Sequence, residues 1–134
     1  MPISLTEAKQ AVEAAIRKAE ELDVLISVAV CDEGGHLLAF SRMDGAGWAG
    51  VYGAQGKAVA SAATGAPSGR IPPDLTVMRR INELAGDRMI YAQGAAPIRL
   101  EGRVVGAIGT GGASAEQDEI CALAGADAIM KTHG

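Results

Sequence analysis

The stretch of the chain that best combines close backbone approach with chemically active side chains runs from residue 102 to residue 119. It predicts an apolar strand from Val104 to Thr110, a glycine turn at Gly109–Gly112, and a helix that begins at Ser114. A strand without a polar face needs cover on both faces, and glycines let a second backbone or a ligand approach closely where the strand ends. We therefore predict a site at this junction.

The first turn of the following helix carries three carboxylates and a capping pair. Ser114 and Gln117 form an S-x-x-Q capping box, in which each side chain satisfies a backbone N–H group. A glycine turn before a helix can bind phosphate, but Glu116, Asp118 and Glu119 crowd the turn, and no lysine follows the glycines as in a P-loop. Two interpretations stay open: the acids complement the helix dipole, or they belong to a site.

Length and composition predict one domain that spans residues 1–134. The chain is 49% apolar with 18 glycines and 3% aromatic residues, so small aliphatic side chains must fill its core. A net charge of -4 without a basic cluster argues against a nucleic-acid partner. We see neither a leader segment nor an apolar run long enough to span a bilayer, and we therefore expect a cytoplasmic protein without a membrane partner.

Metal chemistry is not expected. Metal sites need clustered ligands, and the first histidine, His36, follows a predicted turn with no second histidine near it. Cys31 and Cys121 lack CxxC spacing and are expected to be buried thiols rather than a disulfide.

Hydrophobic periodicity and turn residues predict an α+β fold. A Ser4–Glu7 capping box begins the first helix, and two glycine-containing turns, residues 32–35 and 101–102, join strands into hairpins. Adjacent strands linked in this way favour a single five-stranded antiparallel sheet packed by helices. The five expected strands are Leu25–Cys31, His36–Met43, Met89–Gln93, Pro97–Leu100 and Val104–Thr110.

A glycine-rich helix is expected from Gly47 to Ala63. Glycines at positions 50, 53 and 56 each cost about 1 kcal/mol of helix propensity relative to alanine, so close contact with a helix, a sheet, a flat ligand or another subunit must offset that cost. Lys57 is the only cation in this helix. It either lies on the surface or holds an anionic group.

Four arginines make the region after this helix locally positive in an acidic chain. This excess of positive charge suits a carboxylate-bearing ligand or a partner subunit. At least two of the four arginines are explained simply as solvated surface residues. They are Arg70, Arg79, Arg80 and Arg88.

Several motifs together resemble the GlcG/HbpS family, which includes the C-terminal domain of PduO-type corrinoid adenosyltransferases. The match runs from the first helix to the last. The motifs are Asp-x-Gly-Gly-His-Leu-Leu-Ala-Phe at 32–40, Arg-Met-Asp-Gly-Ala at 42–46, Lys-Ala at 57–58, Val-Gly-Ala-Ile-Gly at 105–109, Gly-Gly at 111–112 and Glu-Gln-Asp-Glu at 116–119.

The resemblance implies a profilin-like fold, a homo-oligomer from a dimer up to an octamer, and a small-molecule pocket at the glycine-bearing strand ends. It also implies either small-acid catabolism, including tautomerisation, or haem or corrinoid binding. Haem binding in some relatives uses a histidine on the first helix, whereas no histidine precedes His36 here. We therefore expect no cofactor and keep haem as the alternative.

Three functions compete. The first is a tautomerase-type enzyme in which Asp118 or Glu116 is the general acid/base and a small-molecule carboxylate is bound by other residues. The second is a tetrapyrrole-binding protein, and the third is a non-catalytic oligomeric module. The substrate-binding residues expected for the first function are Arg42, Lys57, Gly109, Thr110, Gly111, Gly112 and Gln117.

Overall fold

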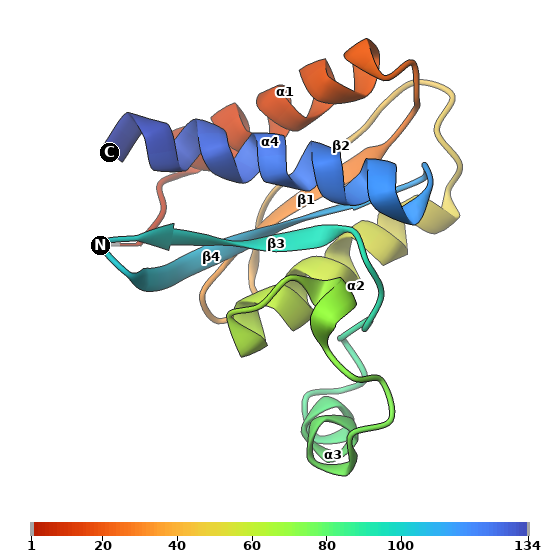
Figure 1. Cartoon of the computed structure of the whole chain (residues 1–134), viewed down its shortest axis with the longest axis vertical. Coiled ribbons are helices and arrows are strands. Elements are labelled where there is room, and N and C mark those ends of the chain that lie inside the picture. Colours follow the sequence, from red (N-terminus) through yellow and green to blue (C-terminus); the bar gives the residue numbers. More distant parts are fainter. Residues whose placement is uncertain (1, 134) are drawn as a thin grey trace.

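The computed structural model describes residues 2–133, with the backbone alone for residues 132 and 133. These residues form four α-helices, a short 3-10 helix and four strands, which come in two consecutive pairs (Figure 1). In order they are α1 (Leu5–Glu21), β1 (Ser27–Asp32), β2 (Leu37–Arg42), α2 (Ala49–Thr64), η1 (Ser68–Arg70), α3 (Thr76–Leu84), β3 (Ala95–Leu100), β4 (Arg103–Gly111) and α4 (Ala115–His133).

The sheet is antiparallel with the strand order β2-β1-β4-β3. The α+β class and both predicted hairpins are confirmed, because β1 pairs with β2 and β3 pairs with β4. The two hairpins join through β1 and β4, which pair in register from Ser27 opposite Gly111 to Asp32 opposite Gly106. Both central strands are buried, as their apolar runs predict.

The prediction of a fifth strand at Met89–Gln93 is wrong, because the sheet has four strands. Donors in this segment bond to helices instead of a strand: the Met89 N–H donates to Asn82 Oδ1 at 2.8 Å, and the Ile90 N–H donates to the Gly56 carbonyl oxygen at 3.0 Å. Side chains of Met89 and Tyr91 pack with Ile71 and Met78. An apolar run of strand length here forms a loop that packs on α2 and α3.

Helices cover both faces of the sheet (Figure 1). α1 and α4 lie together on one face, where Gly125 of α4 packs so tightly that an added Cβ would lie 2.7 Å from the Ala11 carbonyl oxygen. α2 lies on the opposite face, and α3 extends away from the sheet without a buried residue. In the described part of the chain, no helix combines the length and apolarity needed to cross a membrane.

Candidate functional site

The predicted glycine rim of the sheet is filled by α2. A Cβ added to Gly109 would overlap the Ala54 carbonyl oxygen, and one added to Gly111 would lie 2.8 Å from the Gly50 carbonyl oxygen. The glycines therefore let α2 approach β4 closely, which accounts for them without a ligand. Ligand binding by Gly109, Thr110, Gly111 and Gly112 stays a prediction.

Lys57 and Asp118 lie together, although 61 positions separate them in the sequence. Lys57 Nζ is 3.4 Å from Asp118 Oδ2, and the two residues are 7% and 4% exposed. The surface alternative for Lys57 is thereby excluded. The ammonium also donates to the Gln93 carbonyl oxygen at 3.4 Å, and Asp118 Oδ1 accepts from the Ala113 N–H at 3.0 Å.

This ion pair lies beside the N-terminal end of β3. Lys57 comes from α2 on one face of the sheet, and Asp118 comes from α4 on the other face. A Cβ added to Gly94 would lie 2.5 Å from Lys57 Nζ and 3.1 Å from Asp118 Cβ, so this glycine, with a φ of 142°, makes room for the pair.

The electrostatics of Asp118 are set by its burial. Desolvation raises the pKa of its carboxyl group, while the Lys57 ammonium and the Ala113 N–H act in the opposite direction. Both carboxylate oxygens already have partners inside the protein. Proton abstraction from a substrate would require the ion pair to open.

Three other predicted site residues, Glu116, Gln117 and Arg42, make no hydrogen bond to this pair. Glu116 is exposed, and the Gln117 amide oxygen accepts from the Ser114 N–H at 3.2 Å as the predicted capping box requires. Arg42 is exposed on β2, at the opposite edge of the sheet from β3, where its Nε donates to the Ala46 carbonyl oxygen at 2.9 Å. The structure therefore brings together two of the expected charged residues, Lys57 and Asp118.

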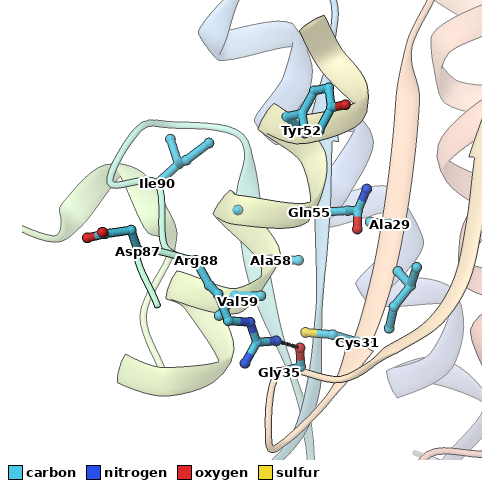
Figure 2. A pocket seen from close by; sticks show the side chains of 12 residues that line it. Ala29, Cys31, Gly35, Tyr52, Gln55, Ala58, Val59, Asp87, Arg88 and Ile90 are labelled. Atoms are coloured by element: carbon cyan, nitrogen blue, oxygen red, sulfur yellow. Dashed lines mark hydrogen bonds between the residues drawn. The ribbon is translucent and has the colours of Figure 1, made fainter. Parts of the chain in front are cut away.

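A groove of about 350 Å³ lies on the α2 face of the sheet, between α2, the β1–β2 hairpin and residues 87–90 (Figure 2). We call it the α2 groove. Its walls are mostly small and apolar, and polar groups stand at its edge. The apolar residues are Ala29, Leu37, Ala58, Val59 and Ile90, and the polar ones include Tyr52, Gln55, Asp87 and Arg88.

Arg88 provides the positive charge of the α2 groove. One of its guanidinium N–H groups donates to the Gly35 carbonyl oxygen, which fixes the side chain beside the hairpin turn. Figure 2 shows the Asp87 carboxylate pointing away from the Arg88 guanidinium. An arginine has five N–H donors, so Arg88 keeps donors for an anionic ligand.

Cys31 contributes a neutral thiol to the floor of the groove. Burial raises the pKa of Cys31 to about 12, so the thiolate is scarce at neutral pH. Cys31 and Cys121 are both buried free thiols, as predicted.

The sequence does not predict this groove, because the pocket was expected at the Gly109–Gly112 turn. Arg88 was one of the four arginines expected to suit a carboxylate, but Tyr52 and Gln55 were missed. The signal that could have found Tyr52 is its position four residues after Trp48, because aromatic rings at this spacing on a helix meet on one face. Among the described residues, no group of three or more His, Cys, Asp or Glu side chains could hold a metal ion.

Comparisons with known proteins agree with one another. A family model described as "Haem degrading protein HbpS-like" matches residues 3–127. Protein GlcG of Escherichia coli K12 is 30% identical over 107 residues, which cover 80% of this chain and 79% of GlcG.

Solved structures show the same fold. A double mutant of Streptomyces reticuli HbpS has a TM-score of 0.85 at 31% identity, covering 95% of this chain and 86% of that one. The structure titled "PduOC:Heme Complex" has a TM-score of 0.83 at 22% identity, covering 96% of this chain and 95% of the other, and this likeness concerns the fold alone.

Proposed function

This chain belongs to the HbpS-like family, and from that premise we propose that it is a small-molecule-binding protein whose ligand occupies the α2 groove. The ligand carries a carboxylate on an apolar body. The observation that supports this proposal is the Arg88 guanidinium at the edge of an otherwise largely apolar groove. Ligand pockets commonly combine apolar walls with a few polar groups that orient the ligand.

The size of the groove favours a small ligand. Ligand pockets span about 300 to 1,000 Å³, and a volume of about 350 Å³ lies near the lower limit. A small organic acid suits this volume better than a macrocycle does.

Haem is the second candidate, because the matching family model is described as haem-degrading and one structure of the same fold is titled as a haem complex. These names favour the tetrapyrrole alternative over the proton-transfer alternative. The apolar walls and Arg88 suit the ring and a propionate, but the groove does not offer the usual axial imidazole. Among described side chains the one imidazole is His36, which is exposed and bonded through Nδ1 to Asp32 at 3.1 Å. We therefore derive no haem chemistry from these residues.

The tautomerase hypothesis has less support. Asp118 would be its general base, and both oxygens of this carboxylate are bonded to Lys57 and Ala113 within the fold. The comparisons name no proton-transfer reaction. Homo-oligomer assembly and a cytoplasmic location remain proposals that light scattering and cell fractionation would test.

Titration calorimetry with small organic acids, and an absorption titration with haemin, test the proposal. We expect Arg88→Gln to weaken binding about tenfold, because a hydrogen bond to a charged group contributes about 1.5 kcal/mol or more. Arg79→Gln is the matched control, since Arg79 is exposed on α3 and does not line the groove. Equal binding by both variants, or no binding of acids or haemin to the natural chain, would overturn the proposal.

A further inference from the structure

The chain places two of its four aromatic residues at the surface next to the α2 groove. Trp48 and Tyr52 are 69% and 67% exposed, and their rings meet edge to face with centroids 6.2 Å apart. Tyr52 also lines the groove. An aromatic residue that is this exposed contributes little to the core, whereas a ring held at the edge of a cavity offers a stacking surface for a second ring.

The aromatic group and the charge lie at different ends of the groove. In Figure 2 the groove follows α2 from Tyr52, past Gln55, to Val59 and the neighbouring Arg88 guanidinium. The seven steps along the helix from Tyr52 to Val59 correspond to roughly 10 Å at 1.5 Å per residue. A ligand that uses both ends must therefore be elongated.

Ile90 and Ala29 line the middle of the groove. Ile90 forms one side by packing on Gly56, where an added Cβ would lie 2.5 Å from Ile90 Cγ1. The opposite side is β1, which presents Ala29 to the groove, and Gln55 reaches toward it from α2 (Figure 2). A linker between the ring and the carboxylate of a ligand would pass these mostly apolar residues.

We propose that the ligand of the α2 groove is an arylalkanoic acid, with an aromatic ring stacked on Tyr52 and a carboxylate that accepts hydrogen bonds from Arg88. This inference rests on the proposed function, and it adds the shape and ring type of the ligand. The Trp48 ring supports Tyr52 from the side, which limits the orientations of the stacking surface.

Three acids measured by titration calorimetry test this inference on the whole chain. 3-Phenylpropionate has both features, 3-cyclohexylpropionate keeps the length but lacks the aromatic ring, and benzoate keeps the ring but is short. We expect 3-phenylpropionate to bind at least five times more tightly than either of the others. Tyr52→Leu should remove most of this preference, whereas Phe40→Leu, which removes a ring outside the groove, should leave it intact.

The outcomes separate the inference from the proposed function. If the three acids bind equally tightly, or if Tyr52→Leu leaves the preference unchanged, the stacked aryl acid is overturned and the carboxylate site stands. If none of the acids binds but haemin does, the aryl acid is likewise overturned and the tetrapyrrole candidate stands. If neither acids nor haemin bind, both proposals fall.

Discussion

Replacing single glycines by alanine tests whether α2 is held against the sheet by glycine contacts. A Cβ on Gly53 would meet only Lys57 Cε, at 3.9 Å, so the alanine side chain fits there. A Cβ on Gly109 would overlap the backbone of α2 at Ala54 and lie 2.8 Å from the Ala58 nitrogen. Helix backbone cannot move aside as easily as the end of a flexible side chain can. The two substitutions add the same methyl group and should have opposite effects.

The magnitudes follow from these contacts. Gly53→Ala should raise the free energy of unfolding by about 0.5 to 1 kcal/mol, the helix propensity difference between the two residues. Gly109→Ala should lower it by about 3 kcal/mol, at the upper end of overpacking costs, because α2 must move away from β4. For a chain of this size, 1 kcal/mol corresponds to roughly 4 °C in Tm.

Urea unfolding followed by far-UV circular dichroism measures both effects, since Trp48 is too exposed for its fluorescence to report the core. Gly56→Ala is a useful intermediate, because its Cβ would meet the side chain of Ile90 rather than backbone. We expect it to cost less than Gly109→Ala. A Gly109→Ala protein as stable as the natural chain would refute the close-packing account of the glycine rim.

Three further substitutions or modifications test the electrostatics. Lys57→Met should make the free energy of unfolding fall more steeply as pH rises above 3.8, because the Asp118 carboxyl, whose folded-state pKa is raised above its unfolded value, then ionises without its ammonium. Urea unfolding at several pH values measures this effect. The added slope should disappear in the double variant with Lys57→Met and Asp118→Asn. Burial raises the pKa of Cys31 to about 12 and that of Cys121 to about 11, so both thiols should resist iodoacetamide at pH 8 in the folded protein and react after unfolding. Mass spectrometry measures the modification, and rapid reaction in the folded state would contradict their burial. Asp32→Ala should lower stability by about 1 kcal/mol at pH 7, since its carboxylate accepts two backbone N–H groups. Partial burial raises the pKa of Asp32, but these hydrogen bonds and His36 lower it overall. The stability that Asp32 contributes should therefore be lost as pH falls below 3.8, and the difference in stability between the natural chain and Asp32→Ala should disappear.

Local signals predicted the elements well. The capping boxes at Ser4 and Ser114 form as expected, because each involves residues three positions apart whose geometry depends on one helical turn. Glycine turns likewise predicted both hairpins. The prediction of a strand at Met89–Gln93 was wrong. The periodicity of a five-residue apolar run does not show whether the run pairs with a strand or packs on a helix.

The candidate site was harder to predict because its contacts are long-range. Lys57 and Asp118 were each singled out, yet the sequence does not show that they bond to each other around the end of β3. The glycines at 109–112 predicted close approach correctly, but the approaching groups are α2 at Gly109 and Gly111 and the Leu25 carbonyl oxygen at Gly112. Arg88 and Tyr52 line the same groove because residues 87–90 pack on α2. No local sequence pattern indicates this packing.

The position of the Lys57 counterion in the chain has a consequence for biosynthesis. The ribosome adds Lys57 61 residues before Asp118, and α4 follows the other helices of the described residues. Until that helix emerges, a nascent chain that docked α2 on the sheet would bury an ammonium without its carboxylate, which is costly. Docking of α2 on the sheet should therefore be less favourable before α4 has been synthesised than after it.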